Sequence, residues 1–385
     1  MLHTIASLAA VVPSNTSHPQ VIWLYVGFVA LVMVFLALDL GVFHRHAHVV
    51  KAKEAISWTI VWIVCAMIFN VAVYFIYENH VLGIGRDVQQ LGAAARDVGG
   101  AEAAKLFFTG YIVEKSLSMD NVFVIAMIFT YFGVPAMYQH RVLFWGILGA
   151  LLMRGLMIGV GAALIAKFSW IVYVFGGFLI LSAIKMAVLK SENVDPNRNP
   201  AVRLVRKLMP VTPHYDGQKF FTRWDGKRAA TPLFLTLVLV EFTDLIFAVD
   251  SIPAIFAITA DPFIVFTSNV FAILGLRALY FCLANLITAF RYLKPALILV
   301  LAFVGVKMLL VHTAYKIPNT VSLLVIISLL GLAVLASWLI PAKPGEEKHL
   351  PGPEGILDPG SLLRRDGSAK DAPAAPADPG STPKT

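Results

Sequence analysis

Charged residues and cysteines are scarce in this chain, and each shortage excludes a class of protein. Only 14% of the 385 residues are charged, while 58% are hydrophobic and the mean hydropathy is +0.76. Soluble domains carry about 25% charged residues. The two cysteines, Cys65 and Cys282, lie in apolar segments, where they fit neither a disulfide framework nor a thiolate metal site. The composition therefore predicts an all-α, polytopic helical membrane protein.

Enzyme motifs are also missing. We find no nucleophile–base motif, no glycine-rich phosphate loop and no HExxH metal motif, so we predict that the chain is no enzyme and holds no permanent cofactor. The formal net charge of +8 is compatible with nucleic-acid binding. However, the basic residues gather in a few loops beside apolar segments, which is typical of membrane topology. We therefore expect a lipid bilayer, and no nucleic acid, as a partner.

Apolar segments long enough to cross a bilayer as helices occur about nine times. They cover residues 21–43, 57–77, 106–131, 142–166, 170–189, 233–259, 263–289, 295–315 and 320–340. The loop 190–231 between the fifth and sixth segments holds nine Lys and Arg residues against four acids. Basic loops stay in the cytoplasm. Nine alternating spans then predict a periplasmic N-terminus and a cytoplasmic C-terminus in a bacterial inner membrane.

The predicted domain organisation follows these spans. The N-terminal region, residues 1–104, contains two spans and an outer loop. Two three-span repeats, 105–190 and 232–316, flank the basic cytoplasmic loop 191–231. The last span is 317–341, and the tail 342–385 is rich in Pro, Gly, Ala and Asp, so we expect it to be disordered and cytoplasmic.

Two of the predicted spans carry several acids near their centres, in the stretches 114–121 and 241–251. A charged side chain at the centre of a bilayer costs about 3 kcal/mol or more, and such residues usually mark an ion or substrate pathway. The acids offer oxygen donors without nearby cysteine, which suits Mn²⁺, Mg²⁺ or Ca²⁺ better than Zn²⁺ or Cu⁺. The sequence therefore predicts a divalent metal site near the middle of the membrane.

The two repeats show matching polar residues in the same order. Glu114 and Asp120 are six residues apart, as are Asp244 and Asp250. An arginine in an apolar context follows in the next span of each half (Arg154 and Arg277), and a lysine in the third (Lys185 and Lys307). Three spans per repeat place the second repeat in the membrane with opposite orientation, a common plan of secondary transporters whose sites lie between the repeats.

Residues six apart on a helix differ by about 240° in direction. One shared site would therefore need helices that unwind near the acids, and the polar run 114–121 and Pro253 favour such breaks. The alternative is that buried bases, namely Lys115, Arg154 or Arg277, neutralise the acids without any metal. The predicted metal residues are Asp120, Asn121, Asp250, Glu114, Glu241 and Asp244. The predicted supporting residues are Ser251, Arg154, Arg277, Lys307 and Asp39, and Asp39 could equally be a simple interfacial residue.

Three motifs carry a resemblance to a known family: Leu38-Asp39-Leu-Gly-Val-Phe43, Glu114-x-Ser-Leu-Ser-x-Asp120-Asn121, and Glu241-Phe-Thr-Asp244 with Asp250-Ser251-x-Pro253. With these motifs the chain resembles the TerC family of integral membrane proteins, most of all its Alx-type branch, over about residues 20–340. The resemblance implies a bacterial inner-membrane protein related to LysE-type exporters, and it places the ion site on Glu114, Asp120, Asn121, Glu241, Asp244 and Asp250. Family members are implicated in manganese export and in tellurite resistance, and Alx-like members are described as membrane redox modulators.

Two functions follow as hypotheses. The first is Mn²⁺ efflux through a midplane carboxylate site between the repeats, with protons moving inward on Glu114 or Glu241. The alternative is a membrane protein of the tellurite or alkaline stress response, a redox modulator without transport activity of its own. A third hypothesis is that the basic loop 190–231 and the tail bind cytoplasmic partner proteins, with the membrane part mainly as an anchor. The sequence indicates no particular protein partner.

Overall fold

Helices make up most of the computed structural model, which describes residues 19–41, 52–90, 93–188, 199–224, 226–283, 292–313 and 315–339. The long helices are α2 (Ile22–Gly41), α3 (Ala52–Glu78), α4 (Gly100–Phe132), α5 (Ala136–Lys167), α6 (Ile171–Val188), α8 (Pro232–Phe256), α11 (Leu293–Leu309) and α12 (Asn319–Leu339). The shorter helices are η1 (Pro19–Val21), η2 (Val81–Gly83), α7 (Pro200–Leu208), α9 (Pro262–Leu274) and α10 (Leu276–Leu283).

The predicted spans coincide with these helices, the seventh with the pair α9 and α10 in its described part. In the described residues, five helices are long and apolar enough to cross a membrane: α3, α5, α6, α8 and α12. Helices α2 and α9 are shorter and apolar, and α4 is 33 residues long but carries Glu114, Lys115 and Asp120. The fold is therefore that of a helical, polytopic membrane protein. The predicted tail 342–385 lies outside the described residues.

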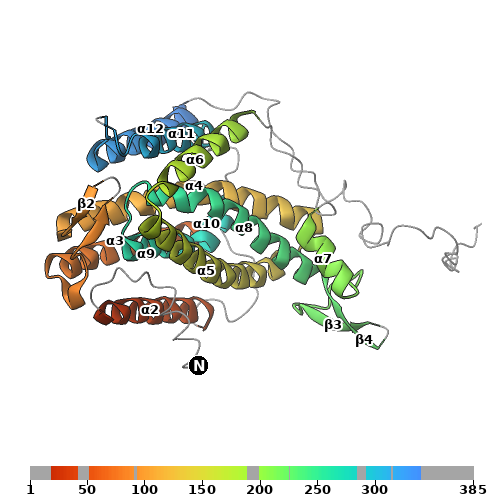
Figure 1. Ribbon diagram of the computed structural model, residues 1–385. Coiled ribbons are helices and arrows are strands. Elements are labelled where there is room, and N and C mark those ends of the chain that lie inside the picture. The colour runs from red at the N-terminus through yellow and green to blue at the C-terminus, as the bar shows by residue number, and fades with distance from the viewer. Residues whose placement is uncertain are drawn as a thin grey trace, which may run out of the picture.

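Two small β-hairpins were not predicted. The first pairs β1 (Val88–Gln90) with β2 (Ala93–Arg96), and the second pairs β3 (Phe221–Trp224) with β4 (Lys227–Ala230). Between β3 and β4 the sequence reads Asp225-Gly226, a dipeptide favoured in two-residue hairpin loops. Gly226 has φ +73°, which glycine adopts without strain. The two hairpins lie at opposite ends of the molecule (Figure 1).

The expected helix breaks beside the acids were wrong. Helix α4 continues through the polar run 114–121, and α8 continues past Pro253 to Phe256. Neighbouring helices supply partners for the polar side chains. Pro253 removes one backbone bond of the helix, and α8 ends three residues later, at Phe256. The interruption occurs instead at Gly275, between α9 and α10.

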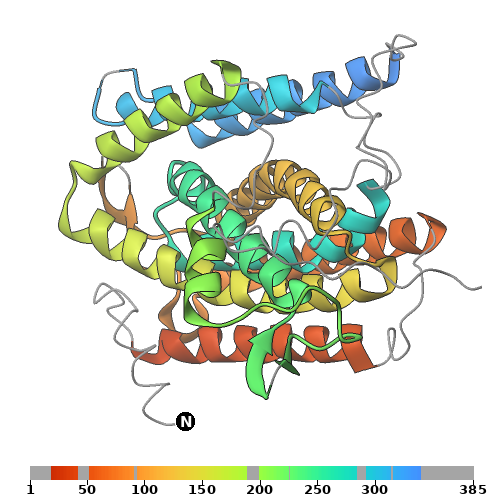
Figure 2. The same ribbon diagram turned by 90° about the vertical axis from the view of Figure 1, so that its right-hand side faces the viewer.

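Helix pairs that are distant in sequence build the interior. Helix α4 packs along α9 and α8, α5 packs along α8, and α6 packs along α11. Figure 2 shows α6, α11 and α12 on one side of α4 and α8, with α2 on the opposite side. Small residues permit this close approach, as is common between membrane helices. A Cβ atom on Gly305 of α11 would lie 3.0 Å from the carbonyl oxygen of Gly176 in α6.

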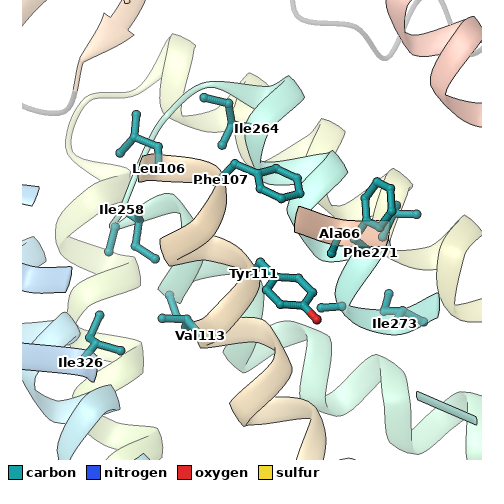
Figure 3. Close-up of a cluster of buried hydrophobic side chains, with 14 of the residues drawn as sticks. Ala66, Leu106, Phe107, Tyr111, Val113, Ile258, Ile264, Phe271, Ile273 and Ile326 are labelled. Carbon is teal, nitrogen blue, oxygen red and sulfur yellow. The ribbon is translucent and has the colours of Figure 1, made fainter. Parts of the chain in front are cut away.

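Apolar side chains seal the contact between α4 and α9. Figure 3 shows Phe107 and Tyr111 of α4 beside Phe271 and Ile273 of α9, with Ala66 of α3 in the same cluster. Phe107 and Phe271 meet with ring centroids 6.2 Å apart in an edge-to-face arrangement. This cluster fixes the height and rotation of α4, and therefore the direction in which its acids point.

Candidate functional site

Arg154 occupies the centre of a buried polar group formed by four helices. Helix α5 carries this residue, which is 2% exposed. Its Nη1 forms an ion pair with Glu114 of α4, and it also donates to Oδ1 of Asn269 in α9 at 3.0 Å and to Oγ of Ser251 in α8 at 3.3 Å. The pairing of Arg154 with acids, which the sequence offered as the alternative to a metal, is present.

Asp244 of α8 receives two bonds from the same guanidinium. Arg154 Nη2 lies 3.2 Å from Asp244 Oδ1, and Nε lies 3.4 Å from Oδ2. This two-point contact matches the planar fork of arginine to the carboxylate and fixes the relative rotation of both groups. Asp244 and Ser251 are seven residues apart, so they lie on one face of α8, the face towards Arg154.

Helix α4 presents a polar stripe to this group. Glu114, Ser118 and Asn121 are spaced by four and three residues, which puts them on one helical face. Ser118 donates its hydroxyl to Glu114 Oε1 at 3.2 Å, and Asn121 Nδ2 donates to Asp244 Oδ1 at 2.5 Å. Residues from both acid-bearing helices are therefore brought together, as the sequence predicted, and without any unwinding.

A small cavity of about 20 Å³ adjoins this group. Its polar lining consists of Glu114, Ser118, Asp120, Asn121, Arg154, Asp250 and Ser251. Met186 of α6, Leu301 of α11, Leu117 and Phe247 complete its wall. A cavity of this size has room for one water-sized species. Asp250 is held there by Ser182 of α6, whose hydroxyl donates to its Oδ1 at 2.7 Å.

The described residues do not form a ready-made metal cage. No group of three His, Cys, Asp or Glu side chains gathers closely enough among them to hold an ion. Glu114 Oε2 and Asn121 Oδ1 are nevertheless buried acceptors with no hydrogen-bond partner among the described residues. Arg154 supplies the positive charge between the carboxylates of Glu114 and Asp244.

Other predicted residues lie away from Arg154. Glu241 is about one turn along α8 from Asp244 and lies against Gly149 of α5, where its carboxylate fills the space that a side chain would need. Lys307 donates to Asn319 Oδ1 at 2.9 Å, at the start of α12. Arg277 is buried in α10, which packs on α3 and α4. The side chain of Asp39, near the end of α2, lies outside the described residues.

Lys115 is directed away from the acids. Its Nζ donates to the carbonyl oxygen of Ala272 at 3.2 Å and would lie 2.7 Å from a Cβ atom on Gly275. A positive charge at the C-terminal end of α9 is favourable because the unpaired carbonyls there carry partial negative charge. Lys115 therefore stabilises the α9–α10 junction, while its neighbour Glu114 belongs to the polar group around Arg154.

Sequence reasoning missed Asn269, Ser118 and Ser182. Asn269 and Ser118 are buried and Ser182 is partly buried, and each bonds to a charged residue of the site. The signal for Asn269 was the polar triplet Thr267-Ser268-Asn269 inside an apolar span. Single serines in apolar helices carry less information, because they also bond to the backbone of their own helix.

Taken together, the site brings four acids together with three bases. Glu114 and Asp244 face the guanidinium of Arg154, and Asp120 and Asp250 line the adjoining cavity. Lys294 lies close enough to Asp120, and Lys185 close enough to Asp250, to interact with them electrostatically. Carboxylate, amide and hydroxyl oxygens are hard donors that suit Mg²⁺, Ca²⁺ or Mn²⁺. A free cation could use the Glu114 and Asp244 carboxylates only if the guanidinium moved away from them.

Comparison with known proteins agrees with the fold and the motifs. Residues 99–344 match the family described as "Integral membrane protein TerC family". The chain is 49% identical over 316 residues to "Uncharacterized membrane protein STKORF319" of Myxococcus xanthus, covering 82% of this chain and 92% of the relative.

A second relative carries a functional description. It is "Putative membrane-bound redox modulator Alx" of Escherichia coli (strain K12), 44% identical over 327 residues, which cover 84% of this chain and 97% of the relative. An "Uncharacterized membrane protein" of Rickettsia felis is 41% identical over 310 residues, with 80% and 95% covered. No solved structure matches the chain. On the family match and these identities, the chain belongs to the TerC family of integral membrane proteins.

Proposed function

We propose that this chain is a divalent cation transporter, and not an enzyme, that exports Mn²⁺ from the cytoplasm. The observation that carries the proposal is the buried guanidinium of Arg154 between Glu114 and Asp244, beside a cavity lined by further oxygen donors. Two carboxylates around one tethered cation resemble a cation site in its empty state. A purely structural ion pair would not require Asp120, Asn121 and Asp250 to line an adjoining cavity.

The proposed cycle begins when Mn²⁺ approaches Asp120 and Asp250. Arg154 then leaves Asp244, and Glu114, Asp244 and the amide oxygen of Asn121 become ligands. The unpaired acceptors Glu114 Oε2 and Asn121 Oδ1 would gain a partner in this step. An inward-moving proton on Glu114 would reset the site. The hard oxygen ligands favour Mn²⁺ over softer ions.

We also propose that two inverted repeats, residues 105–190 and 232–316, build this site. The packing supports a twofold relation, because α4 packs along α9 as α8 packs along α5, while α4 contacts α8 and α6 contacts α11. In this scheme the equivalent acids Glu114 and Asp244 meet at the axis. Rocking of one repeat against the other would expose the site to alternate sides.

The proposed orientation has the N-terminus in the periplasm and the C-terminus in the cytoplasm, in a bacterial inner membrane. The arrangement of helix ends supports alternating spans. The start of α2, the segment 83–89, the end of α5 and the segment 260–263 line one cavity of about 90 Å³. The basic segment 199–230 lies at the other end, where Tyr215 donates to the carbonyl oxygen of Phe132 at 2.7 Å.

Cellular manganese provides the test. Cells that lack their own manganese exporters would be challenged with Mn²⁺, and the metal content measured by elemental analysis at matched membrane expression of each variant. We expect the natural sequence to lower cell Mn²⁺, and Asp120→Asn, Asp250→Asn and Glu114→Gln to abolish this effect. In Mn²⁺-loaded vesicles, purified protein of the natural sequence should move Mn²⁺, and the three purified variants should not. Absence of any metal movement in both assays would refute transport.

The name of the Escherichia coli relative favours a second candidate, a redox modulator in stress responses. Its test is the double substitution Cys65→Ser with Cys282→Ser, because thiols are the obvious redox groups in this sequence. If Mn²⁺ export fails with the natural sequence while a stress phenotype depends on both thiols, the redox function replaces transport. If the thiol-free protein retains the phenotype, a thiol mechanism is eliminated.

A further inference from the structure

We propose that helix α7 and the β3–β4 hairpin form an interface for anionic phospholipids, a feature that the proposed transport does not require. The two elements lie at the same end of the molecule, beside the start of α8 (Figure 1). Together they carry exposed apolar side chains next to exposed basic ones, and this combination is typical of segments that lie in the headgroup region of a membrane.

The surface of helix α7 consists of a buried apolar strip, an exposed apolar strip and a basic strip. Val202 and Val205 are buried and pack onto the ends of α4, α5 and α8. With about 100° per residue, Leu204 and Leu208 lie next to this buried strip and continue the apolar arc. They are 56% and 72% exposed. A large aliphatic surface that the protein itself does not cover, at the ends of membrane helices, matches the acyl boundary of the bilayer.

The opposite arc of α7 is basic. Arg203 and Lys207 are four residues apart and exposed, so they lie one above the other on the helix surface. Long basic side chains at such a position can cover apolar surface with their methylene stems while their charges reach phosphate groups. The helix thus offers adjacent apolar and cationic strips, in the order that a lipid tail and its headgroup would meet.

The hairpin adds a second cationic position. Arg223 and Arg228 are paired directly across β3 and β4, and both are exposed. Like charges facing each other across a strand pair destabilise a hairpin, so an anion between them would relieve this repulsion. At the tip, Trp224 is exposed beside Lys227, and tryptophan is enriched at the membrane–water interface.

The charge of this region is poorly balanced by the protein. Six basic residues of the described segment are exposed: Arg203, Lys207, Lys219, Arg223, Lys227 and Arg228. Within that described segment the acid is Asp216, which already pairs with Lys219 at 3.1 Å and accepts from Thr222 at 2.7 Å. The neighbouring apolar anchors favour an anionic membrane surface over a nucleic acid, which would require no exposed leucines.

Spin labelling of the full chain tests the proposal. A label would be placed at Leu208→Cys, in a background with Cys65→Ser and Cys282→Ser, and the protein reconstituted in phosphatidylcholine vesicles with and without phosphatidylglycerol. We expect the label to become more accessible to oxygen, and less accessible to a water-soluble nickel reagent, when phosphatidylglycerol is present. High salt should reverse the change, because salt screens surface charges.

Charge variants supply the control. Substituting Arg203, Lys207, Arg223 and Arg228 with Gln should lower the docked fraction relative to the undocked one, about fivefold for each charge removed. The matched control, Arg86→Gln with Lys167→Gln, changes exposed bases outside this segment and should leave the label's response unchanged. Because all these side chains are exposed, folding is not at risk, and size-exclusion chromatography would verify it.

Three outcomes would overturn the proposal. The first is a label at Leu208 that reports the same environment in both vesicle types. The second is a phosphatidylglycerol response that persists in the four-residue variant. The third is a response that appears only after RNA is added, which would identify a nucleic-acid surface in place of a lipid one.

Discussion

Nη2 of Arg154 in α5 lies 3.2 Å from Oδ1 of Asp244 in α8, and the same guanidinium also contacts Glu114 in α4. One cation therefore connects three helices inside the membrane region. All three side chains are buried. Removing one member of a buried group leaves the others with uncompensated charge, so each partner depends strongly on the rest.

The first prediction concerns stability. Arg154→Gln should lower the free energy of unfolding by about 3–5 kcal/mol, because Glu114 and Asp244 would remain buried without their counter-charge. The measurement is thermal or denaturant unfolding in detergent micelles. Arg96→Gln is the matched control: Arg96 also pairs with a carboxylate, that of Glu102, but its side chain is 52% exposed, so a loss of only about 0–1 kcal/mol is expected. Equal losses in the two variants would contradict the central role of Arg154.

A second prediction separates the acids by position. Glu114→Gln and Asp244→Asn should weaken Mn²⁺ binding about tenfold or more, equivalent to at least ~1.4 kcal/mol, because both carboxylates are Mn²⁺ ligands in the proposed cycle. Glu241→Gln should change it little, because Glu241 lies against Gly149. Calorimetric titration of the three purified variants with Mn²⁺ would measure this. A loss with Glu241→Gln as large as with Glu114→Gln would show that the site extends one turn further along α8.

The third prediction tests the contact between α6 and α11. A Cβ atom on Gly305 would lie 2.8 Å from Ile180 and 3.0 Å from the Gly176 carbonyl oxygen. Gly305→Ala should therefore destabilise the protein by about 1–3 kcal/mol through overpacking. Gly331→Ala, in α12 with open space around it, should be neutral or stabilise by up to about 1 kcal/mol through helix propensity. The measurement is the unfolding midpoint of each variant. A Gly305→Ala variant as stable as the natural sequence would refute this close helix contact.

A fourth prediction addresses the interrupted seventh span. Lys115→Met should remove the bond to the Ala272 carbonyl oxygen and destabilise the α9–α10 junction locally by about 1.5–3 kcal/mol, the range for hydrogen bonds to charged groups. Hydrogen exchange of residues 272–279 should accelerate accordingly. Lys105→Met is the control, since Lys105 is exposed near the start of α4. Unchanged exchange in Lys115→Met would mean that Gly275 alone determines the break.

The sequence predicted the helices well because their signal is strong. Long apolar segments must be helical in a bilayer, where every backbone group needs a partner within its own segment. The position of the break could not be predicted the same way. The polar run 114–121 and Pro253 indicated breaks in α4 and α8, but both helices continue because the polar side chains find partners on neighbouring helices. The observed break lies at Gly275, where the sequence gave little local signal. The second hairpin was predictable from Asp225-Gly226, a turn signal hidden inside a basic loop.

The contacts among the polar residues were predicted in part, and their role as a metal site stays a prediction. The pairing of Arg154 with acids was foreseen as the alternative to a metal, and the structure contains it. Which acids Arg154 contacts depends on how α4, α5 and α8 are rotated about their axes, and residue spacing alone does not give these rotations. Spacing by four and three residues unites Glu114, Ser118 and Asn121 on one face, while Glu241 and Lys115 belong to the same motifs but point elsewhere. Predicting the contact of Asn269 with Arg154 would have required knowing which helix passes beside α5.

The fixed charge of the Arg154 guanidinium also affects the proton gradient across the membrane, from which the cell draws energy. Arginine keeps its proton at every pH that a cell meets, so the centre of this protein holds a fixed positive charge that cannot pass a proton along. In the proposed cycle Glu114 takes up its proton only after Arg154 has moved away, so the resting state, with the guanidinium between Glu114 and Asp244, is not the state that moves protons. A resting copy of the protein should therefore leave the gradient across its membrane intact, however many copies the membrane contains.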